Sequence, residues 1–174
     1  MAIEAFIKFE GSQNPINGES RDSKLKGSDG WSNLQEFAFA TSNKVNFGTG
    51  GAGVTDRAVF DDLTITKLVD TASPRLFASL CSGGRYDTVI IAVRNAGGPG
   101  EPAEPYLEYK FAMVLVTAID TSVQRGDAAP AEVVKFAYGA LQIAYRPLDA
   151  QGKPGAPVSQ AWSRVLNKAT LAVK

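Results

Sequence analysis

The spacing of apolar residues along the chain predicts a protein built mainly from β-strands. Residues 2–9 alternate, with Ile3, Ala5, Ile7 and Phe9 on one face, which is the period of a half-buried strand. Patterns rich in apolar, aromatic and β-branched residues predict further strands at 31–40, 58–70, 86–95, 106–120, 133–146 and 158–167, and a short one at 18–21.

One segment, residues 73–82, has the signals of a helix instead. Ser73 is the expected N-cap and Pro74 the first helical residue, while Gly83 and Gly84 follow as a stop signal. The helical stripe consists of Leu76, Phe77 and Leu80. Because so short a helix is unstable alone, we expect these three side chains to pack inward on the sheet.

The strand predicted at 133–146 changes its apolar phase part of the way along. Phe136 and Tyr138 follow one phase, and Leu141 and Ile143 follow the other. Gly139 lies at the change, which predicts a β-bulge there. Seven or eight strands with one short helix predict a mainly β fold, a two-sheet β-barrel or sandwich, formed by a single domain over residues 1–174.

Composition excludes several kinds of chemistry. The 174 residues include 18 basic and 18 acidic side chains, no histidine and one cysteine, Cys81. The balanced charge gives no sign of a nucleic-acid partner, and it permits self-association. Without histidine there is no Ser-His-Asp or Cys-His mechanism, and one cysteine allows neither an internal disulfide nor a multi-cysteine zinc site. We expect no catalytic residues, no cofactor and no metal.

We expect no Sec signal peptide at the start of this sequence. Its first residues lack the basic and apolar regions of a Sec signal peptide. No apolar stretch in the sequence is long enough to span a bilayer, so we expect no membrane insertion.

Residues 41–57, TSNKVNFGTGGAGVTDR, are predicted to form a long loop. A glycine-rich loop suggests phosphate binding, but neither the Lys-Ser or Lys-Thr pair nor the helix of a P-loop follows. A protruding contact loop is favoured. The adjacent Asp61 and Asp62 are expected on opposite faces of a solvated strand edge. Cys81, near the end of a helix, is expected to be a small buried or half-buried residue.

Within residues 31–40 the two faces differ. Trp31, Gln35, Phe37 and Phe39 share one face, and its large aromatic rings belong in a core. The other face carries Leu34, Glu36, Ala38 and Ala40, small and mixed residues that suit a surface or the wall of a cavity.

Several local sequences, taken in order, resemble one family. They are AIEAFIKFEG at 2–11, GES at 18–20, the pair Phe37 and Phe39, GTGGAG at 48–53, LTITKLVDTASPRLFASLCSGG at 63–84, LQIAYRP at 141–147 and the strand around Trp162. On these residues, and above all on 63–84, the chain resembles Hcp, the haemolysin-coregulated protein that builds the inner tube of the bacterial type VI secretion system. Residues 11–30 and the C-terminal tail depart from the family's pattern.

The resemblance implies a hexameric ring that stacks into a tube, propelled by a contractile sheath beneath a VgrG-type spike protein, with small effector proteins in the lumen. It implies assembly in the bacterial cytoplasm and then secretion without a signal peptide. On this view Glu36, Ala38 and Ala40 face the lumen. The loop that contacts the neighbouring ring then includes Asn43, Lys44, Val45, Asn46, Phe47, Gly48, Gly50 and Gly51.

Two other classes of protein remain open. One is a non-secretory β-barrel binding module that uses the 41–57 loop for a ligand. The other is an enzyme without histidine, which is disfavoured because the sequence contains no recognisable reactive constellation.

Overall fold

A computed structural model describes residues 2–11, 15–47, 53–96, 103–127 and 129–174. Its elements, in chain order, are β1 (Ile3–Glu10), a 3-10 turn (Gly27–Asp29), β2 (Trp31–Leu34), β3 (Glu36–Ala38), β4 (Thr41–Ser42), β5 (Val45–Phe47), β6 (Gly53–Thr55), β7 (Val59–Phe60), β8 (Leu63–Leu68), α1 (Ser73–Ser82), β9 (Arg85–Asn95), β10 (Leu107–Ser122), β11 (Ala131–Tyr145) and β12 (Val158–Ser163).

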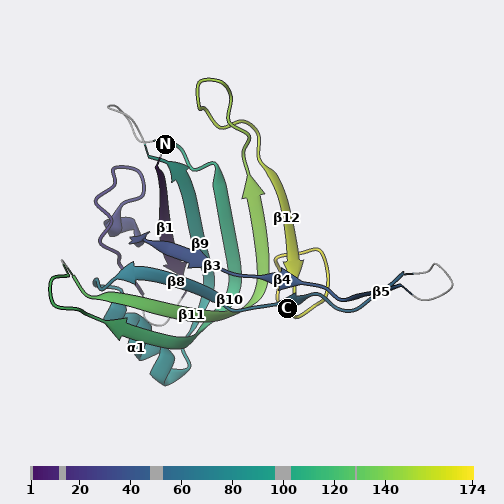
Figure 1. Ribbon diagram of the computed structural model, residues 1–174, viewed down its shortest axis with the longest axis horizontal. Helices are drawn as coiled ribbons and strands as arrows, with labels where there is room; N and C mark the ends of the chain where they lie inside the picture. Colours follow the sequence, from purple (N-terminus) through teal and green to yellow (C-terminus); the bar gives the residue numbers. More distant parts are fainter. Residues whose placement is uncertain (1, 12–14, 48–52, 97–102, 128) are drawn as a thin grey trace.

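Eight strands form one antiparallel sheet that folds around a common core (Figure 1). The strand order is β2-β1-β9-β10-β11-β8-β3, and β12 also pairs with β11. The long strand β11 serves both halves, because its N-terminal part pairs with β8 and its C-terminal part pairs with β12. The predicted two-sheet barrel with one helix is confirmed.

The sheet bends where β10 and β11 cross from one half to the other. Met113 has a positive φ of 53°, and the paired residues on either side of it keep one register with β11. Opposite it, a Cβ on Gly139 would come within 2.9 Å of Met113 Cε and 3.1 Å of Val173 Cγ1. Tyr138 and Leu141 consequently both point into the core. The predicted phase change at Gly139 is therefore present, but the predicted bulge there is wrong, since the register shift lies on β10 between Val116 and Ala118.

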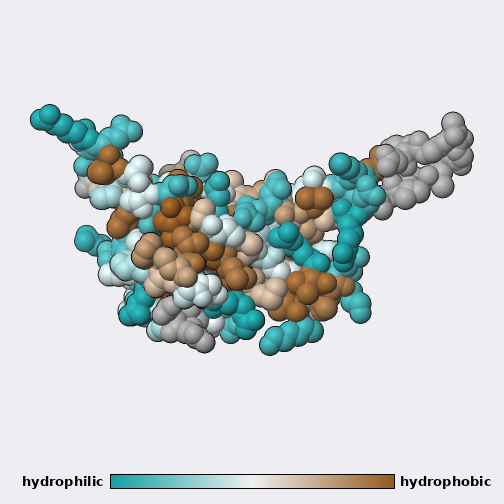
Figure 2. Space-filling view, turned by 90° about the horizontal axis from the view of Figure 1, so that it is seen from below, coloured by the Kyte–Doolittle hydropathy of each residue, from teal (hydrophilic) through white to brown (hydrophobic). Residues whose placement is uncertain are grey.

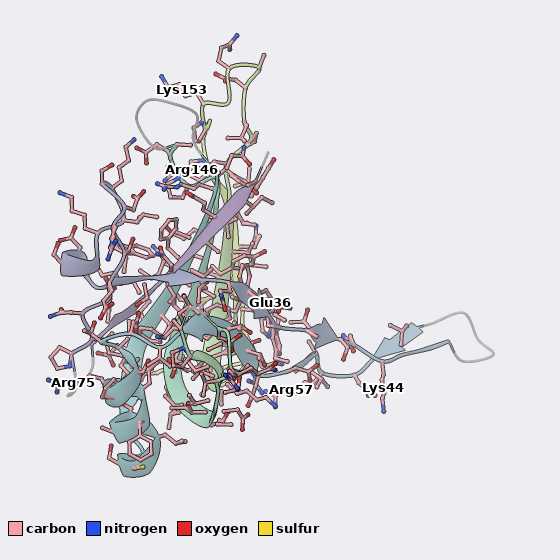
Figure 3. All side chains as sticks on the ribbon, turned by 60° about the vertical axis from the view of Figure 1, so that its left-hand side comes forward. Glu36, Lys44, Arg57, Arg75, Arg146 and Lys153 are labelled. Carbon is pink, nitrogen blue, oxygen red and sulfur yellow. The ribbon has the colours of Figure 1, made fainter. Side chains whose placement is uncertain are left out.

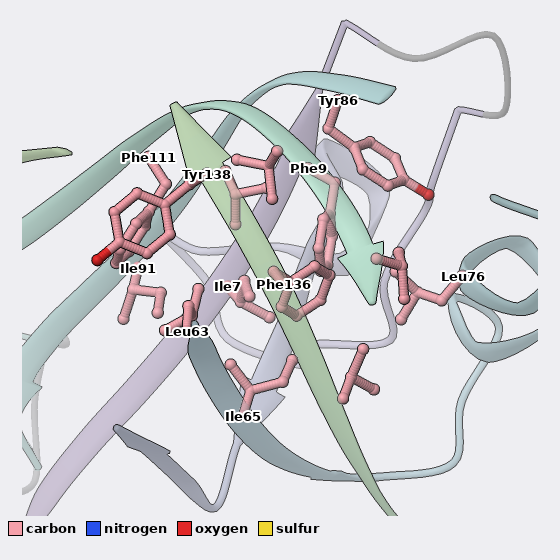
Figure 4. Close-up of a cluster of buried hydrophobic side chains, with 14 of the residues drawn as sticks. Ile7, Phe9, Leu63, Ile65, Leu76, Tyr86, Ile91, Phe111, Phe136 and Tyr138 are labelled. Carbon is pink, nitrogen blue, oxygen red and sulfur yellow. The ribbon is translucent and has the colours of Figure 1, made fainter. Parts of the chain in front are cut away.

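The core lies between the two halves of the sheet and is dominated by branched and aromatic side chains (Figure 4). Phe9 packs against Tyr86 with ring centroids 5.2 Å apart, and Phe111 packs against Tyr138 at 4.9 Å. Phe39 extends this aromatic packing with an edge-on contact to Phe111 at 5.6 Å. Such tilted and edge-on contacts are the favourable geometries for aromatic rings.

The helix α1 has the bounds that the sequence predicts, Ser73–Ser82, and it packs against the lower end of the sheet (Figure 1). Its N-cap is Ala72 rather than Ser73, because the Ser73 hydroxyl instead accepts a hydrogen bond from the Asp70 N–H at 3.1 Å. Leu76 is fully buried and Leu80 is half-buried against the core, as predicted.

The predictions that Phe77 and Cys81 are buried or half-buried are wrong. Phe77 was expected to turn inward, but 61% of its surface is exposed, because only a narrow stripe of a single helix can touch the sheet. The second buried position is Ser79, whose hydroxyl lies 2.7 Å from the Tyr86 hydroxyl. Cys81 was expected to be buried or half-buried and is exposed, since it lies on the same side of the helix as Phe77.

The continuous strand predicted at 31–40 is also wrong. The chain bends at Gln35, so that β2 pairs with β1 and β3 pairs with β8 at the other end of the sheet. The Gln35 N–H donates to the Thr66 carbonyl at 2.9 Å, which holds the bend against β8. Phe37 and Phe39 nevertheless pack against the core as predicted.

Candidate functional site

The most prominent feature outside the core is a two-stranded arm formed by residues 41–47 and 53–60 (Figure 1). β4 pairs with β7 and β5 pairs with β6, and among the described residues no strand pairing joins these strands to the main sheet. The described parts of the segment predicted to be a loop at 41–57 therefore pair as antiparallel strands, which the sequence pattern missed because each ladder has only two or three residue pairs.

Five of the predicted contact residues, Asn43 to Phe47, lie on this arm. Asn43, Lys44 and Val45 are exposed, and Lys44 extends from the ribbon of the arm (Figure 3). Asn46 and Phe47 belong to β5, but their side chains lie outside the described residues, as do Gly48, Gly50 and Gly51 entirely.

The base of the arm is anchored by the C-terminal segment. The Arg164 guanidinium lies over the rings of Phe60 and Tyr138, 5.6 and 5.2 Å from their centroids. It also donates a hydrogen bond to the Tyr138 carbonyl at 3.0 Å. Beside this anchor is a hollow of about 450 Å³ lined by residues of the arm together with Trp162 and Asn167.

Glu36, Ala38 and Ala40 are all exposed, and their position in the lumen stays a prediction. Glu36 is paired with Thr66 and Ala38 with Thr64, on the side of β3 opposite the buried rings. Figure 3 shows Glu36 near the base of the arm. The nearby Asp61 and Asp62 are exposed too, and Asp62 accepts a hydrogen bond from the Thr117 hydroxyl at 3.0 Å.

A second feature is an apolar surface that is continuous with the core but not covered. We call it the open face, and it consists of Ile143, Tyr145, Val158 and Trp162, with exposed fractions of 40%, 46%, 66% and 38%. Register pairs Tyr145 with Val158 and buried Leu141 with Trp162, so these residues lie on the side of the sheet that elsewhere faces the core. Other apolar residues reach the surface between polar ones on the side seen in Figure 2.

Two ion clusters, each centred on a buried basic side chain, stabilise the sheet at places that the sequence pattern did not identify. Lys67 is fully buried and contacts Asp70 at 2.5 Å and Glu132 at 2.9 Å. Asp70 also accepts hydrogen bonds from the Ser32 hydroxyl at 2.7 Å and the Ala72 N–H at 2.9 Å. This Lys67 cluster therefore joins β8, β11, β2 and the start of α1. The sequence did contain one sign of this cluster, because Lys67 falls on the same face of the strand as the apolar residues Leu63 and Ile65.

The other cluster is centred on Arg94 in β9, whose guanidinium donates to Glu4 at 2.8 Å and to Asp22. The hydrogen bond from Arg94 is the main reason that the pKa of Asp22 falls to about 2, and the N–H groups of Leu25 and Lys24 contribute. The cluster ties the segment before β2 to the outer side of the sheet.

These groups show no arrangement typical of catalysis or metal binding. Among the described residues, no group of three or more histidine, cysteine, aspartate and glutamate side chains is placed to hold a metal ion. Within the same part of the chain, no helix is long and apolar enough to cross a membrane. A hollow of about 650 Å³ near the other face of β10 and β11 has a mixed lining that includes Lys24, Glu104 and Arg146.

Solved structures share this fold over nearly the whole chain. A structure described as a type six secretion system protein matches with a TM-score of 0.84 and 28% identity, over 97% of this chain and 100% of that one. Hcp1 from Salmonella typhimurium matches with a TM-score of 0.75 and 24% identity, over 98% and 100%. The anti-feeding prophage baseplate, at a TM-score of 0.53 and 8% identity over 82% and 93%, shares the fold alone.

Sequence comparison leads to the same family. Protein hcp1 of Pseudomonas aeruginosa is 33% identical over 103 residues, which is 59% of this chain and 62% of that relative, so the aligned part spans less than two thirds of its length. A family model described as "Type VI secretion system effector, Hcp" matches residues 6–145. Because that match covers most of the chain, this protein belongs to the Hcp family of type VI secretion system proteins.

Proposed function

We propose that this chain is a structural subunit that assembles into six-membered rings, and that the rings stack into the inner tube of a type VI secretion system. The observation that carries the proposal is the match of fold over 97% of the chain to a type VI secretion protein, together with family membership. The projecting arm and the open face support it, because both are suited to contacts between copies.

In this proposal the tube is driven by a contractile sheath, lies beneath a VgrG-type spike protein and carries small effector proteins. The subunit is made in the bacterial cytoplasm and leaves through the secretion system itself. These partners follow from the resemblance to the family.

Glu36, Ala38 and Ala40 line the lumen in this proposal, because they are exposed and mostly small residues on and directly after β3. Ala38→Gln places a larger polar group on that face without touching the core. We expect the variant to form rings as the parent does but to retain less effector in pull-down assays. Loss of ring formation would instead place Ala38 at a subunit interface.

The arm contacts the neighbouring ring in this proposal. The test uses a Cys81→Ser background, because the native Cys81 is exposed and would react. Single cysteines at Asn43, Lys44 or Val45 should then give cross-linked species that bridge stacked rings under mild oxidation. A cysteine at the exposed Asp149 is the control, and tubes without any arm-dependent cross-link would contradict the assignment.

Negative-stain imaging and light scattering of the purified protein test the assembly itself. Rings of six copies are the expected result. A protein that stays monomeric at high concentration would overturn the tube proposal and favour a binding module that uses the arm.

A further inference from the structure

The bend of the sheet contains a residue in an unfavourable backbone conformation. Met113 in β10 has a φ of 53°, and among the described residues other than glycine only Asn167 also has a positive φ. A side chain makes this conformation costly, so it persists only where the surrounding contacts favour it. The packing of the Met113 side chain therefore bears directly on the shape of the bend.

That side chain packs over Gly139, at the facing position of β11. The residue pairs on either side of Met113 keep one register with β11, which places Gly139 directly opposite. A Cβ on Gly139 would lie 2.9 Å from Met113 Cε and 3.1 Å from Val173 Cγ1. The thioether methyl of Met113 and a methyl of Val173 therefore lie over the same stretch of bare backbone, in the space that a side chain at 139 would need.

Val173 belongs to the C-terminal tail, residues 169–174, which side-chain packing holds in place. In the part of the chain that the structure describes, the hydrogen bonds of this tail reach only two residues back. The Thr170 N–H donates to the Lys168 carbonyl at 2.8 Å, and the Ala172 N–H donates to the Thr170 hydroxyl at 3.1 Å. Val173 is nevertheless half-buried. The position of the tail therefore depends on apolar contacts such as the one over Gly139.

Met113 is half-buried and lies outside the main core cluster, so a small oxidant can reach its sulfur from the solvent. A peroxide oxidises a thioether by transferring one oxygen atom. A lone pair of the sulfur attacks the peroxide, the O–O bond breaks, the S–O bond of a sulfoxide forms, and water leaves. The sulfur loses two electrons and the peroxide gains them. The product is a polar side chain in place of a flexible apolar one.

We propose that Met113 is a site of oxidation by peroxides, and that its sulfoxide releases the tail, residues 169–174, from the bend. A sulfoxide oxygen is a hydrogen-bond acceptor, which is disfavoured in an apolar contact without a donor. The oxidised side chain therefore turns away from Gly139, and Val173 loses the methyl group beside which it packs. This inference concerns a single copy and does not rest on the proposed ring.

The test uses trypsin, which cleaves after Lys168 only when the chain around that residue leaves its packed position. Cleavage there releases residues 169–174 as the peptide ATLAVK. The protein carries Cys81→Ser, because the exposed thiol of Cys81 would also react with peroxide. Dilute hydrogen peroxide should add one oxygen atom to the peptide that contains Met113 and should raise the rate of cleavage at Lys168 at least tenfold. Mass spectrometry measures both.

Two variants in the same background serve as controls, and far-UV circular dichroism checks that both fold. Met113→Leu keeps an apolar side chain of similar volume that forms no sulfoxide, so peroxide should leave its cleavage rate unchanged. This variant retains Met1, the other methionine, and therefore also detects any effect of oxidation there. Val173→Ala shortens the tail's side of the contact and should raise the cleavage rate without peroxide.

Enzymatic reduction tests the proposal without a substitution at the bend. Treatment of the oxidised protein with the methionine sulfoxide reductases MsrA and MsrB should restore the slow cleavage. Full oxidation of Met1 with Met113 unmodified would overturn the assignment of the site. Oxidised Met113 with an unchanged cleavage rate, an equal rise in Met113→Leu, or fast cleavage that persists after reduction of Met113 would overturn its control of the tail.

Discussion

Both ends of the sheet have an apolar inner surface, but only one of them is covered. We call the end beside α1 the closed end and the end beside β12 the open end. At the closed end, α1 covers the core through Leu76, and the Lys67 cluster ties the helix start to three strands. At the open end, Val158 and Trp162 remain exposed, and β12 has no second partner among the strands that the structure describes. We interpret the closed end as the part that stabilises a single copy, and we propose that the open end makes contacts between copies.

We expect the largest loss of stability from a substitution of Lys67 in the closed end. Lys67→Met removes the only cation within the buried cluster and leaves Asp70 and Glu132 without their ion pair. We expect the free energy of unfolding to fall by about 3 to 5 kcal/mol, the usual result of leaving a buried charge uncompensated. Urea denaturation of the isolated subunit measures it. The double variant Lys67→Met with Glu132→Gln should recover part of this lost stability. If Lys67→Met lowers the free energy of unfolding by less than about 1 kcal/mol, the cluster does not stabilise the closed end.

Leu76 and Phe77 are neighbours on α1, but their substitution by alanine should change the free energy of unfolding by different amounts. Leu76→Ala opens a cavity in the closed end and should cost about 2 to 5 kcal/mol of unfolding free energy. Phe77→Ala alters only an exposed side chain and should cost about 0.5 kcal/mol or less. Equal losses in urea denaturation would mean that Phe77 packs inward, contrary to the structure.

Asp22 should make stability depend on acid. Its pKa in the folded protein is lowered to about 2 from 3.8, so its contribution is fully present above pH 4 and is lost as the pH falls toward 2. Asp22→Asn should abolish that part of the acid dependence, on the order of 1 to 2 kcal/mol, with Asp29→Asn as the exposed control. Identical acid unfolding of the parent and Asp22→Asn would contradict the role of the Arg94 pair.

Tyr138 lies where the sheet bends between its two halves, and we expect its substitution by phenylalanine to increase stability slightly. Its hydroxyl is buried without a hydrogen-bond partner among the described residues, and burial raises the pKa of the phenol to about 12. Tyr138→Phe should therefore raise the free energy of unfolding by up to about 1 kcal/mol in urea denaturation. A loss of stability would indicate that the hydroxyl has a partner.

The sequence predicted features that depend on neighbouring residues better than features that depend on distant ones. The bounds of α1 follow from Ser73, Pro74 and the two glycines after it, which act within a few residues. The bend at Gln35 and the buried ion pair of Lys67 with Glu132 arise only when strands far apart in the sequence pair. The open face could not be predicted at all, because a strand pattern does not show which part of an apolar face is left uncovered.

Amide hydrogen exchange of the assembled and the monomeric protein is the most direct test of whether β12 lies in a contact between copies. We expect the outward amides of Val158–Ser163 to become at least tenfold more protected on assembly, while the amides of α1 change little. Unchanged exchange in β12, with new protection confined to α1, would show that copies meet through the helix instead.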